Sequence, residues 1–240
     1  MVSSSSSAKS PTEQPTVASL VLGFVIAVGA TLGFGVIAFT FGRGIFLQID
    51  QRALWSAFEL REFEAWLTPI MVSATNLGSI MGLLIQAIIV VAIMYWRNDA
   101  VTRNQIIRFA ITTIGAMVLF VLIKNQIARP RPSLYPSPYH ITTYSFPSGH
   151  SLSSSAFYGG VIQLCIPHIK HRWRRWLLLI GCAMLVMLIG VSRMYFSVHY
   201  PTDVLGGYIG GIAWLFAIQS IWQGVAWRRN GRDSTIGDRR

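Results

Sequence analysis

Two histidines in the second half of the chain stand in patterns that suit phosphoryl chemistry. His199 precedes Asp203 by four residues, and Pro201 between them fits the first turn of a helix. The carboxylate can then hydrogen-bond one imidazole nitrogen and leave the other as a nucleophile. His150, which opens a different apolar segment, can protonate the leaving oxygen as a general acid. These residues indicate phosphoryl transfer to a histidine, followed by hydrolysis.

Cationic residues accompany both histidines. Lys124 and Arg131 follow one apolar run, and Arg193 ends another. Three positive charges around one small volume suit a group with several negative oxygens, such as a phosphate or diphosphate. Ser148 and Gly149 precede an expected helix, where free backbone N–H groups and the positive end of the helix dipole favour an anion. We therefore expect these five residues to bind a phosphoryl group.

The elements that must position these residues are membrane-spanning helices. Of 240 residues, 52% are hydrophobic and 12% charged, whereas a soluble domain carries about 25% charged residues. Uncharged runs at 14–42, 65–96 and 204–227 exceed the ~20 residues that a spanning helix needs. This composition excludes a water-soluble fold, and we attribute the net charge of +11 to membrane topology rather than to a nucleic-acid partner.

The sequence predicts an all-α integral membrane bundle of six transmembrane helices. Residues 1–15 form a Ser- and Pro-rich head that we expect to be disordered, residues 16–227 form the membrane domain, and residues 228–240 form a basic tail. Cys165 and Cys182 lie in apolar runs, where we expect them to pack as small hydrophobic residues. The six spans are expected at about 17–41, 68–95, 105–127, 150–167, 175–194 and 201–223.

The distribution of cations orients this bundle. Six spans place both termini on one side, and 13 of the 20 Lys and Arg residues lie in the head, the 96–108 and 168–175 loops and the tail. Because cytoplasmic loops are enriched in Lys and Arg, both termini are predicted to be cytoplasmic. The opposite ends of spans three to six then meet, so we expect the phosphoryl site to face the extracytoplasmic side.

Three further features lie outside the candidate residues named above. The segment 45–66 is expected to form either a helix on the outer membrane surface, with Asp50 as its N-cap, or an extracytoplasmic connector without a membrane role. Arg129 is expected to have either a head-group or surface role or a role in the catalytic shell. Four glycines at four-residue spacing in the last span predict close helix packing rather than ligand binding; they are Gly206, Gly207, Gly210 and Gly211.

Three motifs in a fixed order carry a resemblance to a known family. The chain reads K-x6-R-P from Lys124 to Pro132, P-S-G-H over residues 147–150, and S-R-x5-H-x3-D over residues 192–203, with every spacing intact. These resemble the signature motifs of the type 2 phosphatidic acid phosphatase superfamily. The expected spans are similar to its membrane lipid phosphatase branch, so the resemblance covers nearly the whole chain.

The resemblance implies a phosphatase that needs neither a metal nor another cofactor. Its substrate would be a membrane lipid phosphate in the bilayer, with undecaprenyl diphosphate as the first expectation and phosphatidylglycerophosphate or phosphatidic acid as the alternative. A different class, a non-catalytic lipid-binding or transport protein that keeps the fold, is the rival interpretation. The implied roles are nucleophile for His199, orienting carboxylate for Asp203, acid and base for His150, and phosphate binding for Lys124, Arg131, Ser148, Gly149 and Arg193.

Overall fold

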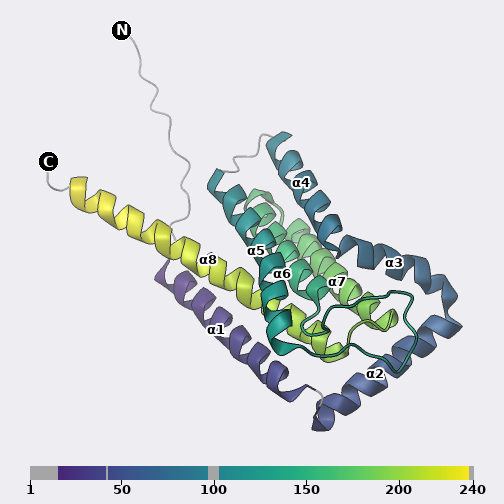
Figure 1. Ribbon diagram of the computed structural model, residues 1–240. Helices are drawn as coiled ribbons and strands as arrows, with labels where there is room; N and C mark the ends of the chain where they lie inside the picture. Colours follow the sequence, from purple (N-terminus) through teal and green to yellow (C-terminus); the bar gives the residue numbers. More distant parts are fainter. Residues whose placement is uncertain (1–15, 42, 97–102, 238–240) are drawn as a thin grey trace.

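The computed structural model describes residues 16–41, 43–96 and 103–237, and side chains as far as residue 228. The expected head at 1–15 lies outside these residues. Within them, every regular element is a helix, as Figure 1 shows. The helices are α1 (Val17–Thr40), α2 (Gly44–Phe63), α3 (Thr68–Leu77), α4 (Ile80–Trp96), α5 (Arg103–Ile127), α6 (Gly149–Cys165), α7 (Arg172–Tyr195) and α8 (Pro201–Gly237), with 3-10 turns at Ala65–Leu67 and Ile166–His168.

Several helices are long and apolar enough to cross a bilayer. Within the described residues, α1, α5, α7 and the first 28 residues of α8 meet that requirement, and the segment from Ala65 to Trp96 meets it as a bent pair. The remaining expected span, α6, has 17 residues and lies at the centre of the bundle, where most of its side chains are buried. The protein is therefore a multi-pass helical membrane protein, and the count of six spans stays a prediction.

The prediction of one continuous helix at 68–95 is wrong, because the segment forms two helices. The axes of α3 and α4 are bent by 68° at Gly78 and Ser79. The Ser79 hydroxyl accepts a hydrogen bond from the N–H of Gly82, and the Gln86 amide donates to the carbonyl of Leu77. Backbone groups within a membrane must be satisfied inside the protein, and these side chains satisfy groups that the break frees.

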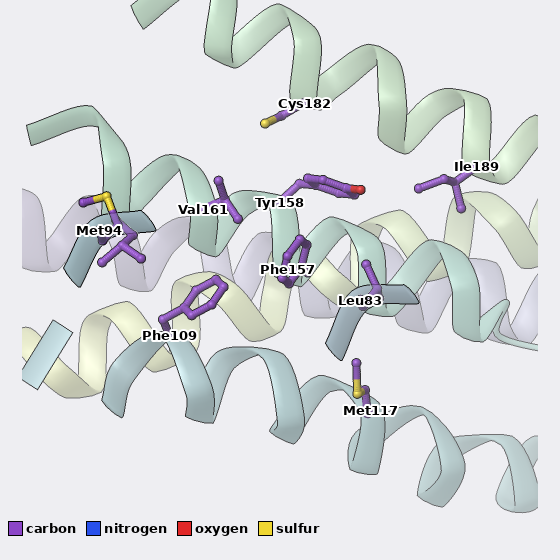
Figure 2. Close-up of a cluster of buried hydrophobic side chains, with 10 residues drawn as sticks. Leu83, Met94, Phe109, Met117, Phe157, Tyr158, Val161, Cys182 and Ile189 are labelled. Atoms are coloured by element: carbon purple, nitrogen blue, oxygen red, sulfur yellow. The ribbon is translucent and has the colours of Figure 1, made fainter. Parts of the chain in front are cut away.

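Helix α6 is enclosed by its neighbours. Figure 2 shows the core cluster, in which Phe157 and Tyr158 of α6 meet Leu83 of α4, Phe109 of α5 and Ile189 of α7. Cys182 belongs to the same cluster, and neither cysteine forms a disulfide.

The glycines of α8 allow the backbones of α6 and α8 to approach closely. A Cβ on Gly207 would lie 2.8 Å from the carbonyl oxygen of Ser148, and one on Gly211 would lie 2.5 Å from that of Leu152. The expected packing role of these glycines is confirmed, and it brings the first residues of α6 against the first residues of α8.

The helix ends that carry the motifs gather at one end of the bundle. Helix α1 runs antiparallel to α8, since Gly23 faces Ser220 and Gly33 faces Ile209. In Figure 1 the end of α5, the start of α6 and the start of α8 lie together beside the 128–148 loop and α2. This arrangement confirms that spans far apart in the sequence bring their motif-bearing ends together.

Helix α2 packs against the motif-bearing loop. Its Arg61 donates a hydrogen bond to the carbonyl oxygen of Pro136 at 2.8 Å, and Phe58 stacks on Tyr135 with ring centroids 4.9 Å apart. The expected N-cap role of Asp50 is wrong, because the helix begins at Gly44, and the Asp50 side chain is fully buried instead. A helix in this segment is confirmed, whereas its place on the membrane surface stays a prediction.

Candidate active site

The starts of α6 and α8 are joined directly. The backbone N–H of Ser148 donates to the carbonyl oxygen of Asp203 at 3.0 Å, and the Ser148 hydroxyl caps α6 by accepting from the N–H of Ser151 at 3.5 Å. A Cβ on Gly149 would lie 2.9 Å from the ring of Phe120. Ser148 therefore fixes the start of α6, and anion binding by the N-terminus of this helix stays a prediction.

His199 and Asp203 form a buried pair at the start of α8. The Nδ1 atom of His199 lies 3.4 Å from Oδ2 of Asp203, a long contact of the kind that apo sites often show. The same oxygen accepts hydrogen bonds from the Ser145 hydroxyl and from the Tyr200 N–H. A proton on Nδ1 that faces the carboxylate leaves the lone pair on Nε2, which is the arrangement that a nucleophilic imidazole requires.

The Nε2 edge of the imidazole contacts Arg131. Nη1 of Arg131 lies 3.3 Å from Nε2 of His199 and donates to the carbonyl oxygen of Val198 at 2.6 Å, while Nε donates to that of Thr143. Burial lowers the pKa of His199 to about 3, although the hydrogen bond and charge of Asp203 oppose this effect. His199 is therefore neutral at physiological pH, and its Nε2 lone pair accepts a hydrogen bond from Nη1 of Arg131.

Two more cations lie close to the cluster of Arg131, His199 and Asp203. Lys124 at the end of α5 is 7% exposed and lies within electrostatic range of Arg131, Asp203 and Arg193. Arg193 at the end of α7 is 4% exposed, and its Nε–H is buried without a partner. A buried donor without a partner is costly, and a phosphate oxygen would satisfy it. The three cations predicted to bind phosphate are thus brought together.

His150, at the start of α6, lies near the other predicted site residues. It interacts with the backbone of Thr75 and lies within electrostatic range of Arg193, His199 and Lys124. Its role as the general acid stays a prediction. Within the described part of the chain, no three His, Cys, Asp or Glu side chains come together as ligands for a metal ion.

The sequence did not predict that four further residues belong to this site. Thr75 comes from the broken span, Ser145 from the loop before α6, and Asp50 and Thr202 from α2 and α8. A polar threonine within the apolar run 65–96 was a usable signal, whereas Ser145 lies in an irregular loop with no periodicity. Arg129, for which two roles were open, is 5% exposed and bonded to Asp203, so it belongs to the site.

Thr75 supports Arg193, which is predicted to bind phosphate. The Thr75 hydroxyl accepts a hydrogen bond from Nη1 of Arg193, and a hydrogen bond to a charged group contributes more than a neutral one. We expect Thr75→Val to lower kcat/KM about 10-fold, because a buried donor loses its acceptor, and Thr75→Ser to keep most of it. Steady-state kinetics of both variants test this, and equal kcat/KM in Thr75→Val and the wild type would contradict it.

Comparisons with known proteins agree on one family. The family model described as the PAP2 superfamily matches residues 105–227. Phosphatidylglycerophosphatase B of Bacillus subtilis is 29% identical over 160 residues, which are 65% of this chain and 75% of the relative. An undecaprenyl-diphosphatase of Sulfolobus acidocaldarius is 33% identical over 119 residues, which are 48% of this chain and 53% of the relative.

A solved structure has the same fold. The crystal structure of a transmembrane PAP2-type phosphatidylglycerolphosphate phosphatase from Bacillus subtilis superposes with a TM-score of 0.73 at 26% identity. The match covers 81% of this chain and 94% of that structure. The likeness therefore extends well beyond the motifs, to the arrangement of the helices that carry them.

Proposed function

Because the chain belongs to the PAP2 superfamily and is thereby a lipid phosphatase, we propose that it removes the terminal phosphate of a membrane lipid through a phosphohistidine at His199. One observation carries this proposal. The Nδ1 atom of His199 faces Asp203, and Nε2 lies 3.3 Å from Nη1 of Arg131, with Arg193 within electrostatic range. A non-catalytic lipid-binding protein would have no need of this oriented imidazole.

In the first half-reaction the phosphoryl group moves to the enzyme. The cations hold the phosphate oxygens and stabilise the charge that develops on them. The Nε2 lone pair of His199 forms a bond to phosphorus as the bond from phosphorus to the leaving oxygen breaks. His150, protonated once the negative charge of the bound phosphate offsets Arg193 and Lys124 beside it, gives its proton to that oxygen. Asp203 stabilises the positive charge that the imidazole of His199 acquires.

In the second half-reaction water regenerates the enzyme. His150, now without its proton, accepts one from a water molecule, and the water oxygen bonds to phosphorus. The bond from phosphorus to Nε2 of His199 then breaks, and inorganic phosphate leaves. Each histidine returns to its starting protonation state, so the cycle consumes only one lipid phosphate and one water.

The proposed substrate is undecaprenyl diphosphate, and phosphatidylglycerophosphate is the second candidate. One matching relative is a phosphatidylglycerophosphatase and another is an undecaprenyl-diphosphatase. The match to the phosphatidylglycerophosphatase covers more of this chain. We expect phosphate release from undecaprenyl diphosphate in mixed micelles to exceed that from phosphatidylglycerophosphate and phosphatidic acid at equal concentration, with His199→Ala as the blank. Equal rates on all three would exclude a single dedicated substrate, and a higher rate on phosphatidylglycerophosphate would assign the second candidate.

We also propose that the pocket faces the extracytoplasmic side and that both termini are cytoplasmic. Arg103, Arg172, Arg174 and Arg175 lie at the end of the bundle opposite to the pocket, as the enrichment of cytoplasmic loops in cations requires. An epitope tag at either terminus should therefore resist protease in intact spheroplasts and be cleaved after lysis. Cleavage of both tags in intact spheroplasts would place the site in the cytoplasm.

A further inference from the structure

A buried ion-pair network adjoins the pair of His199 and Asp203. Arg129 lies between two carboxylates, with Nη1 at 2.6 Å from Oδ1 of Asp203 and Nη2 at 2.7 Å from Oδ2 of Asp50. Both carboxylates are fully buried and Arg129 is 5% exposed. Buried charges are costly unless they are paired, so the three side chains depend on one another.

Each oxygen of Asp203 has a separate set of partners. Oδ1 pairs with Arg129, while Oδ2 faces Nδ1 of His199. The guanidinium of Arg129 is itself fixed, because it stacks between the rings of Phe41 and Tyr200 at 4.4 and 4.0 Å from their centroids. Arg129 therefore sets the plane of the carboxylate, and that plane determines where Asp203 meets the imidazole.

The position of Asp50 balances the charge of this network. Arg129 paired with Asp203 alone would neutralise the carboxylate that must stabilise a positively charged His199. Asp50 adds a second negative charge, so that the three side chains together keep one net negative charge. The N–H and hydroxyl of Thr202 donate to Asp50 at 3.0 and 2.7 Å, which fixes α2 to the start of α8.

We infer that Asp50 and Arg129 act as a positioning pair: Arg129 orients Asp203, and Asp50 offsets the charge of Arg129 so that Asp203 retains its effect on His199. This inference rests on the proposed function of His199. It gives α2 a role in the reaction, although no residue of α2 belongs to the three motifs. Neither residue of the pair needs to touch the substrate, so the pair acts on the rate of the chemical step.

Charge-removing variants separate this role from a purely structural one. We expect Asp50→Asn to lower kcat about 10- to 100-fold with little change in KM, because the variant neutralises the network. The double variant Asp50→Asn with Arg129→Gln restores one net negative charge and should be at least fivefold faster than Asp50→Asn alone. If the pair had a purely structural role, the double variant would be no faster than Asp50→Asn alone.

Three controls make the outcome decisive. Glu59→Gln removes one charge from the same helix and should keep wild-type kcat. Arg129→Lys keeps the charge but cannot span both carboxylates, so kcat should fall even if Asp50→Asn does not fold. Wild-type kcat in Asp50→Asn or Arg129→Lys, or no recovery in the double variant, would overturn the positioning role. Wild-type activity in His199→Ala, measured alongside, would instead overturn the proposed function.

Discussion

Replacing His199 with alanine is expected to reduce kcat by about 10⁴-fold or more, because the variant has no atom to accept the phosphoryl group. The pocket cations should still bind the head group, so the substrate dissociation constant should change much less than kcat. His199 is only 2% exposed, and the smaller side chain leaves a void, which we expect to cost some stability. Phosphate release and equilibrium binding of the lipid, measured on the same preparation, separate these effects.

A matched variant shows whether the loss is specific. His171 at the start of α7 is exposed and makes no capping hydrogen bond, so His171→Ala should keep wild-type kcat. Both variants should elute as the wild-type protein does in size-exclusion chromatography. Substantial activity in His199→Ala would show that another group receives the phosphoryl group.

Replacing His150 with alanine is expected to slow the reaction about 10²- to 10⁴-fold, in a way that depends on the leaving group. The variant has no acid for the alkoxide that leaves a phosphomonoester lipid such as phosphatidylglycerophosphate, whereas an aryl phosphate such as p-nitrophenyl phosphate releases an oxygen that needs no proton. The rate of the first half-reaction should therefore fall steeply for the lipid and little for the aryl ester.

The same variant also lacks the base for the second half-reaction. With the aryl ester, His150→Ala should release one burst of p-nitrophenol per enzyme and then turn over slowly, because the phosphoenzyme awaits hydrolysis. Stopped-flow absorbance measures the amplitude of the burst. Equal loss of rate for the lipid and the aryl ester, with no burst, would remove His150 from the proton transfers and leave it a binding role.

The sequence predicts the parts of this site that follow from periodicity and fixed spacing. Apolar runs of spanning length place the helices, and the motif intervals place Lys124, His150 and His199 at helix ends that meet. A helical repeat also predicts the close packing of the α8 glycines on α6, which the Cβ contacts of Gly207 and Gly211 confirm.

The parts that the sequence does not predict depend on contacts between distant segments. An apolar run of spanning length gives no sign of the 68° bend that turns Thr75 toward Arg193, because the bend is stabilised by Ser79 and Gln86. Asp50 fits the N-cap of a helix by residue type. Its hydrogen-bond partners Arg129 and Thr202, however, are 79 and 152 residues away from it in the sequence. Local propensity does not encode partners at that separation.

If His199 carries the phosphoryl group, the phosphoenzyme can be trapped in the variant that hydrolyses it slowly. His150→Ala is mixed with an aryl phosphate labelled at the phosphoryl group, quenched in alkaline detergent and digested for mass spectrometry. We predict one phosphoryl group per enzyme, on the peptide that contains His199, stable in base and lost in acid. A label on any other residue, or turnover of the wild type with no labelled protein in either enzyme, would contradict it.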